Sequence, residues 1–526
     1  MEHASFHGAI QARARARPAH PAYVAPARTW TYADVDTTAN RLANALRALG
    51  IQPGERVACL TRHIAECTIL VLAANKIGAV YHGEARFMMA DADFLPVLAP
   101  LELPRLLAVV GTQAAPGAEG MEGWCAASPD SDPGHSAASG DTALQLYSPA
   151  TTGLPKGVEL SHRNRIGVCE TIGSAYGYSL SETVTFNAAP TFHIGGLGMS
   201  FVALYAGSMT VSHPEFDPPR VIEALSRHRV THTFMVPAMI HLLLQVPGVD
   251  QADFSSLRVM GYGAAPITET VLTEAMRIFK CDFIQNYGLT ETTGTIVAQL
   301  PEDDDPGGPR AHLLRAAGKP CPGTGLRIVD AAGRDLPEGE IGEVWIRAPQ
   351  NMIGYWRNEK ATREAYPEGK QDGIGWFRSG DAGYLRDGYL YIKDMIISGG
   401  ENIYPVEVEN VVVQHPAVLD CAVIAVPDDK WGECVKACIV LRPGMQGQAK
   451  EQDIIDFCRE RLAHYKCPRS IDFMEALPRS RRSPAPAGVF SRGQPVADHR
   501  TDMPRRRRKR VMSFRRRQCP GAECAP

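Results

Sequence analysis

The chain has 526 residues, which is too long for one ordinary hydrophobic core, so at least two domains are expected. With 44% hydrophobic and 21% charged residues, the composition is that of a soluble globular protein, and it excludes a wholly disordered, collagen-like or fibrous chain. The formal net charge of −3 indicates no particular class of partner.

Cysteine usage and hydropathy bear on the compartment. The 13 cysteines contain no CxxC pair, which favours reduced thiols over a disulfide framework. No apolar run reaches the ~18 residues of a membrane span. The arginines near the N-terminus are not followed by an apolar segment, so a secretory signal is not expected. We therefore expect a cytoplasmic protein with at most peripheral membrane contact.

The first 80 residues predict alternating helices and strands. Asp34 is placed to cap a helix that Gly50 ends, and a strand at 56–60 and a helix at 64–77 follow. Strands that alternate with helices indicate parallel βαβ units and an α/β fold class. The same alternation recurs further on, with helices at 220–228 and 238–246 and strands at 231–236 and 257–261.

The pattern changes twice after that. Gly, Pro, Ser and Asp predict loops at 114–139 and 301–309, and short strands with glycine turns begin near Asp330. The predicted elements of the last part are a strand at 340–347, helices at 406–414 and 451–462, and strands at 418–426 and 435–441. The sequence thus predicts a large N-terminal multi-sheet α/β domain with a strand-rich subdomain, followed by a small C-terminal α/β domain.

The segment from Tyr147 to Gly157, YSPATTGLPKG, is typical of a phosphate-binding loop. Small and hydroxyl-bearing residues beside glycine leave backbone N–H groups free to surround a polyphosphate, and Lys156 adds a mobile cation. The segment lacks the Walker pattern, and taken alone it could also be a polar turn, although phosphate binding is the favoured interpretation.

Three further motifs strengthen the phosphate interpretation. The motif NYGLTETTG follows a predicted strand at 282–285, and a carboxylate beside hydroxyls at a strand end suits Mg²⁺ together with phosphate oxygens. In GWFRSGD, a loop carboxylate at Asp381 could accept hydrogen bonds from two sugar hydroxyls. The fourth motif is ISGGENIYP, which begins at Ile397.

In this order and at these separations, the four motifs resemble the adenylate-forming (AMP-binding) superfamily. The chain is most similar to its fatty-acid–CoA ligases, through YGLTET, GWFRSGDAGYL, MIISGGENIYPVEVEN and AVIAVPDDKWGE. The likeness extends from about Ser5 to Arg479. It implies ATP-dependent activation of a carboxylic acid to acyl-AMP and then transfer to coenzyme A, with ATP, Mg²⁺ and coenzyme A as cofactors.

The resemblance assigns the phosphate and metal contacts. Thr151 and Gly153 belong to the phosphate loop, Thr290 would contact the α-phosphate, and Glu291 would hold Mg²⁺. The residues with an implied catalytic role are Thr152, Lys156, Thr290 and Glu291. The nucleoside would be held by Asp381 at the ribose, by Tyr287 near the adenine, and by the strand-end segment Gly263, Ala264, Ala265 and Pro266.

The acyl and thiol sites are implied in the same way. His193 matches the gate of the acyl tunnel and Gly195 lies next to it, although a lone histidine is more often a structural residue. Asp394 would be the hinge for a rotation of the small domain. The residues implied for the thioester step are Gly399, Gly400, Glu401 and Lys466.

The likeness and the charge pattern together set the predicted domains. Residues 1–393 form the AMP-binding and acyl-binding domain, and residues 394–478 form a truncated, mobile small domain. Residues 479–526 carry 14 Lys or Arg and 3 Asp or Glu, so the preceding part has 41 basic and 55 acidic residues and a net charge of −14. We expect this last segment to be a basic, disordered tail.

The chain departs from the family pattern in its loop and near its hinge. Pro149 removes a backbone N–H in the phosphate loop and Ala150 disfavours positive φ, so phosphate binding is expected to be weaker. A crossover of about 12 residues or more is missing within the segment 78–86. The segment 391–397 also lacks the arginine that contacts ribose and phosphate beside the hinge.

The largest departure follows Arg479, where the family continues into a Gly-Lys motif. Pro484 stands near the place of that lysine, which bridges the substrate carboxylate and ATP. Our hypothesis is a frameshifted C-terminus. Since losing one preorganised charge contact costs ~10²–10³ in rate, we expect adenylation to be strongly reduced.

Other functions stay open at this point. The chain could be a non-catalytic nucleotide- or acyl-binding relic of the same family. The arginine run 505–517 could bind a nucleic acid or an anionic membrane by charge alone, but such runs are more often solvated tails, so we expect no specific nucleic-acid partner. Medium- or long-chain fatty acids are the implied substrates, aryl and branched acids are alternatives, and a homodimer is implied only by analogy.

Overall fold

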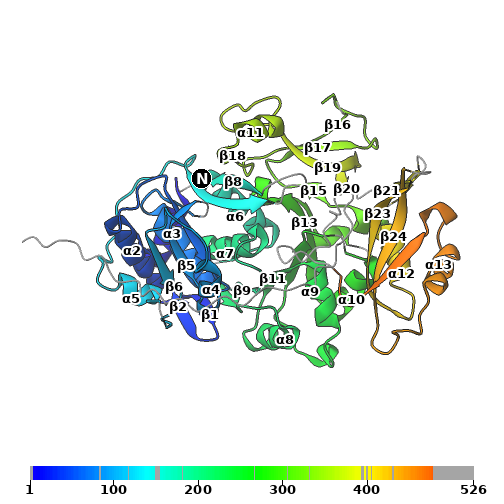
Figure 1. Ribbon diagram of the computed structural model, residues 1–526, viewed down its shortest axis with the longest axis horizontal. Coiled ribbons are helices and arrows are strands. Elements are labelled where there is room, and N and C mark those ends of the chain that lie inside the picture. Colours follow the sequence, from blue (N-terminus) through cyan, green and yellow to red (C-terminus); the bar gives the residue numbers. More distant parts are fainter. Residues whose placement is uncertain are drawn as a thin grey trace, which may run out of the picture.

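The computed structural model of the chain describes residues 4–81, 84–116, 118–148, 155–179, 182–265, 267–304, 306–330, 332–392, 396–398, 401–403, 405–428 and 432–477. Figure 1 shows a large N-terminal part, a strand-rich subdomain beside it, and a small domain at one end of the molecule. The α/β class and the multi-sheet architecture predicted from the sequence are confirmed. No helix among the described residues is long and apolar enough to cross a membrane.

A nine-stranded sheet runs through the middle of the N-terminal part. Its six central strands are parallel, as expected for βαβ units, and antiparallel strands close both edges. In spatial order the strands are β15 (Lys319–Pro320), β14 (Gly294–Gln299), β13 (Asp282–Leu289), β12 (Val259–Gly263), β11 (His232–Met235), β9 (Val184–Asn187), β10 (Met209–Ser212), β1 (Pro21–Ala25) and β2 (Arg28–Thr31).

A seven-stranded sheet forms the second layer of strands. Its spatial order is β18 (Gly354–Tyr355), β8 (Lys156–Ser161), β7 (Thr142–Ser148), β4 (Val80–Tyr81), β3 (Arg56–Leu60), β5 (Ala85–Ala90) and β6 (Ala108–Gly111). The strands β4 and β5 are parallel and pair with opposite edges of β3, yet only residues 82–84 connect them. This short connection is where the sequence indicates a missing crossover, and β4 has only two residues.

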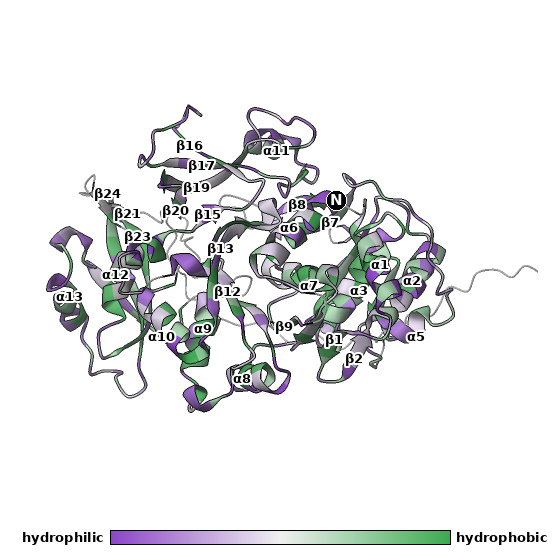
Figure 2. Ribbon diagram, turned by 180° about the vertical axis from the view of Figure 1, so that it is seen from behind, coloured by the Kyte–Doolittle hydropathy of each residue, from purple (hydrophilic) through white to green (hydrophobic). Residues whose placement is uncertain are grey.

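Three helices lie between the two sheets: α3 (Ile64–Asn75), α6 (His162–Ala175) and α7 (Ile194–Ala206). Every residue of α3 except Glu66 is buried, which explains why its sequence is apolar on all sides. In Figure 2 the helices α3 and α7 are mainly hydrophobic, whereas α13 (Glu451–Arg459) at the surface is largely hydrophilic. The apolar run that ends at Asn75 is therefore a core helix.

The remaining helices of the N-terminal part cover its outer faces. The first of these, α1 (Phe6–Ala16) and α2 (Tyr32–Ala48), pack beside α3 and α7. A second core lies on the other side of the nine-stranded sheet, under α8 (Pro218–Arg227), α9 (Pro237–Leu244) and α10 (Glu269–Phe279). The shorter helices of this part are α4 (Leu95–Leu98) and α5 (Met121–Cys125).

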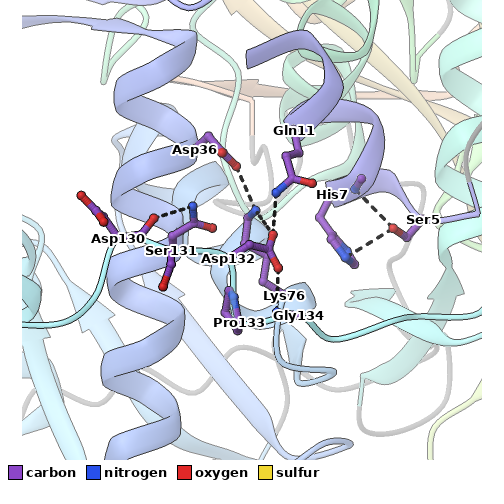
Figure 3. Close-up of polar contacts among 12 residues, drawn as sticks. Ser5, His7, Gln11, Asp36, Lys76, Asp130, Ser131, Asp132, Pro133 and Gly134 are labelled. Carbon is purple, nitrogen blue, oxygen red and sulfur yellow. Dashed lines mark hydrogen bonds and ion pairs between the residues drawn. The ribbon is translucent and has the colours of Figure 1, made fainter. Parts of the chain in front are cut away.

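A buried lysine at the end of α3 joins the N-terminal helices (Figure 3). The Nζ atom of Lys76 lies 2.9 Å from a carboxylate oxygen of Asp36 on α2 and 3.1 Å from one of Asp132, and its side chain is 1% exposed. Gln11 on α1 donates a hydrogen bond of 2.7 Å to Asp132. A buried ammonium group requires such partners, because desolvation would otherwise oppose its charge.

The strand-rich subdomain is an antiparallel sheet of β16 (Gly325–Val329), β17 (Gly342–Arg347), β19 (Phe377–Arg386) and β20 (Tyr389–Ile392), with α11 (Glu359–Ala365) beside it. The small domain has its own core. Its elements are β21 (Ile396–Ser398), β22 (Glu401–Ile403), α12 (Pro405–Val412), β23 (Val418–Asp428), β24 (Gly432–Leu441), α13 and β25 (Ser470–Met474).

Several local predictions need correction. Thr31, not Asp34, caps α2; Asp34 is the third residue of that helix and completes a capping box with Thr31. The predicted loop 114–139 contains α5, and the predicted loop 301–309 begins with a 3₁₀ turn at Pro301–Asp303. The strand predicted at 282–285 continues to Leu289 because it pairs on both sides, with β12 and β14.

Candidate active site

The motif around Thr290 folds into a short 3₁₀ turn, η3 (Thr290–Thr292), directly after β13. The hydroxyl of Thr292 accepts a hydrogen bond of 2.8 Å from the Leu289 N–H and donates one of 2.7 Å to the Gly294 carbonyl. The turn lies against β7 and β8, the two strands that precede and follow the predicted phosphate loop. The tertiary structure thus brings together two motifs that are about 140 residues apart in the sequence.

At the centre of this arrangement is the carboxylate of Glu291, which is 7% exposed. Its Oε1 atom accepts a hydrogen bond of 2.7 Å from the Ser148 hydroxyl and one of 3.0 Å from the Tyr355 hydroxyl. Burial and the neighbouring Glu291 raise the pKa of Tyr355, so its hydroxyl stays protonated as a donor. The carboxylate is therefore fixed from two strands, β7 and β18.

Lys156 lies next to this group. Its Nζ atom is 4.8 Å from the centroid of the Tyr355 ring, and its backbone pairs with Ser148 across β7 and β8. A cation within ~6 Å of an aromatic ring is attracted by the ring's negative face. Lys156, Tyr355 and Glu291 thus place a positive and a negative group on one side of the expected phosphate site.

The residues fit a bound Mg²⁺. Both hydrogen bonds to the Glu291 carboxylate go to Oε1, and no donor within the described ranges contacts Oε2. Those ranges contain no group of three or more His, Cys, Asp or Glu side chains that could enclose a metal ion. Mg²⁺ typically binds through one or two carboxylates and completes its coordination with substrate phosphates and water. A single carboxylate beside a phosphate loop agrees with that preference.

Tyr287 and Asp381 form the second polar pair. The Tyr287 hydroxyl donates a hydrogen bond of 2.6 Å to Oδ2 of Asp381, and burial together with this carboxylate raises the pKa of Tyr287. The sequence placed Asp381 in a loop, but it lies within β19, directly after Gly380, which has φ 80°. Its N–H donates to the Ser379 hydroxyl at 3.0 Å, which fixes the backbone at this irregular point of the strand.

The predicted adenine segment lies beside Tyr287. Gly263 ends β12, and Asn286 is its partner on β13. A Cβ atom on Gly263 would lie 2.2 Å from the Asn286 carbonyl oxygen, so only glycine fits there. The next residue, Ala264, has φ 63°, and with Ala265 it turns the chain away from the strand end. The two parallel strands end at the same edge of the sheet, where α/β proteins usually bind ligands.

His193 has a visible structural role. It is the N-cap of α7, and its Nδ1 atom accepts a hydrogen bond of 3.0 Å from the Gly195 N–H. Burial lowers its pKa, which favours the neutral ring that this acceptor role requires. A Cβ on Gly195 would lie 3.5 Å from the Phe234 ring, so the position beside His193 is closely packed. A role at the acyl tunnel stays a prediction.

The residues implied for the thioester step belong to the small domain. Lys466 lies in a short 3₁₀ turn, η6 (His464–Lys466), before β25, and its Nζ atom is 5.8 Å from the ring centroid of Tyr465. Glu401 begins β22. Seven predicted residues lie outside the described residues: Thr151, Thr152, Gly153, Pro266, Asp394, Gly399 and Gly400.

Two contributors to the site were not predicted. Ser148 belongs to the predicted phosphate-loop segment 147–157 but has no predicted role, and Tyr355 lies outside all four motifs. The only local signal for Tyr355 is the run Gly354-Tyr355-Trp356, in which two aromatic residues follow a glycine. This run precedes the motif that begins at Gly375. Their role depends on contacts across strands, which local sequence does not encode.

Comparison with known protein families agrees with this geometry. The model of the AMP-binding enzyme family matches residues 10–356, and that of the AMP-binding enzyme C-terminal domain matches residues 407–483. The chain belongs to the AMP-binding enzyme family. The second match supports a small C-terminal domain, as the resemblance implied.

Relatives of this family activate different acids. The fatty acid–[acyl-carrier-protein] ligase ScoC of Streptomyces coeruleorubidus is 35% identical over 505 residues, covering 90% of this chain and 92% of ScoC. A feruloyl-CoA synthase of Amycolatopsis sp is 34% identical over 493 residues, covering 89% of this chain and 94% of the relative. The chain is therefore a member of the adenylate-forming acyl- and aryl-CoA ligases. By their names, some of its relatives act on fatty acids and others on aromatic acids.

A solved structure supports the same architecture. The anthranilate CoA ligase AuaEII in complex with anthranoyl-AMP superposes with a TM-score of 0.81 at 28% identity, covering 91% of this chain and 95% of AuaEII. The match spans both domains of the AMP-binding enzyme, so the overall arrangement is that of the family.

Proposed function

We propose that the protein activates a carboxylic acid with ATP to an acyl adenylate and then transfers the acyl group to the thiol of coenzyme A. The observation that carries the proposal is the Glu291 carboxylate, which Ser148 and Tyr355 hold beside Lys156 at the base of the phosphate loop. Family membership supports the same reaction.

In the first step, a carboxylate oxygen of the acid attacks the α-phosphorus, and the bond to pyrophosphate breaks. Lys156 supplies positive charge next to the phosphates, and Thr290, with Thr152 of the loop, supplies hydroxyl donors. Mg²⁺, when held by Glu291, would offset negative charge on the phosphate oxygens. The chain contributes mainly position and fixed charge, which are effective because these groups are already oriented before the substrate binds.

The nucleoside is positioned by the second polar pair. Asp381 accepts hydrogen bonds from the ribose hydroxyls, while the Tyr287 ring lies near the adenine beside the segment that begins at Gly263. The existing hydrogen bond from Tyr287 to Asp381 ties these two contacts to each other. Binding of the base and binding of the sugar are therefore coupled through one side-chain pair.

In the second step, the thiol sulfur attacks the acyl carbon, the bond to AMP breaks, and the thiol proton is released. We assign this step to the small domain, with Gly399, Gly400, Glu401 and Lys466 near the coenzyme and Asp394 as the hinge. Medium- or long-chain fatty acids are our first choice of substrate, and ScoC is a relative that acts on a fatty acid. Aryl acids are the second choice, since a feruloyl-CoA synthase is almost as similar.

A second candidate function is a nucleotide- or acyl-binding protein without catalysis. The sequence observation that favours it is Pro484, which stands near the place of the family's bridging lysine. In this case the protein would bind ATP through the residues around Glu291 and Asp381 but would not form acyl-AMP.

The test is acid-dependent exchange of labelled pyrophosphate into ATP, over fatty acids from C6 to C18 and a set of aryl acids. Exchange with one class, which Glu291→Gln strongly reduces, would support the ligase and identify the acid. The same panel with coenzyme A and with acyl-carrier protein would identify the thiol.

If no acid supports exchange, supplied acyl-AMP is tested with coenzyme A. Thioester formation from it would place the defect in the first step. ATP binding without either reaction in folded protein would support the non-catalytic alternative, and folded protein that binds no adenine nucleotide would contradict both.

A further inference from the structure

A pocket of about 230 Å³ on the surface of the N-terminal part is lined by four arginine side chains. They come from four separate segments: Arg56 at the start of β3, Arg86 on β5, Arg105 in the connection before β6, and Arg357 after β18. The described groups of the candidate active site, Lys156, Glu291, Tyr287 and Asp381, do not line it. The concentration of positive charge is notable because residues 1–478 carry a net charge of −14.

Glutamates only partly balance these cations. Arg56 pairs with Glu159 at 3.0 Å and Arg86 with Glu55 at 3.1 Å. Arg105 and Arg357 share one carboxylate, that of Glu84, at 2.8 Å and 3.0 Å.

Four guanidinium groups therefore face three carboxylates. The shared Glu84 is 46% exposed, so it is partly solvated and could yield a guanidinium to a stronger anion.

Two hydrogen-bond donors on arginines that line the pocket have no acceptor among the described residues. The Nε atoms of Arg56 and Arg86 are buried and have no hydrogen-bond partner in the described part of the chain. A buried N–H of a charged group without an acceptor is unfavourable, so the ion pairs of these two arginines are not ideal. The excess of guanidinium groups over carboxylates, with Glu84 shared by Arg105 and Arg357, separates the pocket from an ordinary surface network of ion pairs.

The guanidinium groups are also held in place. Arg56 and Arg357 lie over the ring of Trp356, with their Cζ atoms 4.9 Å and 4.4 Å from its centroid. Arg56 pairs with Ala85 between β3 and β5, which brings Glu84 and Arg86 next to Arg56. Oriented planar guanidinium groups suit tetrahedral oxyanions, which accept two parallel hydrogen bonds from each.

We propose that this pocket binds the phosphate group of a small molecule, either inorganic phosphate, pyrophosphate or a phosphate monoester, at a site separate from the nucleotide site. A phosphate dianion replaces Glu84 on Arg105 and Arg357, and the positive charges of Arg56 and Arg86, which line the same pocket, attract it further. Glu84 is therefore a competitor of the ligand, and neutralising it strengthens binding.

The experiment measures binding to the full chain by isothermal titration at constant ionic strength, with inorganic phosphate, pyrophosphate and AMP as separate probes. We expect Arg86→Gln and Arg105→Gln each to weaken phosphate binding about tenfold or more, because each variant loses a charged group that attracts the anion. Glu84→Gln should tighten binding severalfold. The matched control is Arg258→Gln, which breaks a surface ion pair of 3.0 Å with Glu182. We expect it to leave the affinity for phosphate unchanged.

Lys156→Ala separates the two sites. If the pocket is the phosphate site, this variant leaves inorganic phosphate binding unchanged. Binding that Lys156→Ala abolishes and Arg86→Gln spares would overturn the proposal, because the phosphate would then occupy the nucleotide site. Absence of phosphate binding by the folded native chain, or weaker binding by Glu84→Gln, would overturn it equally. The relative affinities of the three probes identify the form of phosphate.

Discussion

At the residue scale, the candidate site depends on how one buried carboxylate is held. Glu291 receives hydrogen bonds from Ser148 on β7 and Tyr355 on β18, and Tyr355 also contacts Lys156 through its ring. Since both donors reach the same oxygen, they fix the direction of the carboxylate, and Oε2, which no donor within the described residues contacts, is the atom we predict to hold Mg²⁺. Tyr355 is therefore a positioning residue, which acts through Glu291.

We predict that Tyr355→Phe lowers the rate of pyrophosphate exchange about tenfold or more, because a hydrogen bond to a charged group, which contributes about 1.5–3 kcal/mol, is lost. The ring stays in place, so Lys156 keeps its aromatic neighbour. The rate is measured over a range of Mg²⁺ concentrations, and we expect a higher Mg²⁺ requirement.

The control for this variant is Tyr205→Phe. It removes the same hydroxyl from a hydrogen bond of 3.2 Å to another glutamate, Glu170, at the exposed surface. Equal loss of exchange in both variants, or a Tyr355→Phe enzyme with an unchanged Mg²⁺ requirement, would contradict the positioning role.

Asp304 provides a prediction about pH. Burial raises its pKa from 3.8 to about 6, and within the part of the chain that the structure describes only Oδ1 of its two oxygens accepts a hydrogen bond, from Gln299 at 2.8 Å. Between about pH 4 and 6 the folded state binds more protons than the unfolded state, so this group's contribution to stability falls as pH rises through that window. At pH 7 a buried charge remains.

We therefore expect Asp304→Asn to raise the free energy of unfolding at pH 7 by about 1–2 kcal/mol. The gain should disappear below pH 4, where the native side chain is already neutral. Urea unfolding of both proteins at pH 7 and pH 4 measures the difference, and an equal effect at both pH values would show that ionisation is not its cause.

At the element scale, the contacts of single side chains decide how the N-terminal helices pack. Lys76 follows α3 and pairs with Asp36 on α2 and with Asp132, while Gln11 on α1 binds the same aspartate (Figure 3). One buried cation thus connects three helices and the segment before β7.

We predict that Lys76→Met destabilises the fold by about 2–4 kcal/mol, because it leaves two carboxylates without their counter-charge while keeping the side-chain volume. Adding Asp36→Asn and Asp132→Asn should recover part of this loss. Thermal unfolding of the single and triple variants provides the test. A triple variant no more stable than Lys76→Met would show that packing, not charge, is responsible.

At the scale of the whole molecule, the two domains have separate cores and meet through limited contacts. A cavity of about 680 Å³ lies between α10 and the small domain, where Thr270, Thr273 and Arg315 face Val411 and Gln414. Limited contacts are compatible with the rotation of the small domain that the sequence predicts, and that rotation stays a prediction. The predicted hinge residue, Asp394, lies outside the described residues.

The basic tail provides a prediction at the same scale. Deleting residues 479–526 changes the formal net charge from −3 to −14, so we expect retention on a heparin column to be lost or shifted to much lower salt. The melting temperature should stay within about 1 °C of that of the full chain, because the deleted segment lacks the periodic hydrophobic residues that would pack against the core. Retention by the shortened chain would show that the body, not the tail, binds polyanions.

The sequence by itself determined the fold class, the family and most of the candidate residues. Hydrophobic period and glycine placement are local properties, which is why the strand at 56–60 and the glycine that ends α2 were predicted correctly. The four motifs predict a nucleotide site because each carries its chemistry within a few consecutive residues, as Glu291 does between two threonines.

Only the tertiary structure decided which side chains complete those motifs. Ser148 and Tyr355 reach Glu291 across strands β7 and β18, and Asp381 became a strand residue because β19 continues its pairing through an irregular point. The arginines around Trp356 likewise come from four segments that meet only after the sheet has formed. Contacts between distant segments depend on strand order and register, which are set by packing of the whole chain and not by any local pattern.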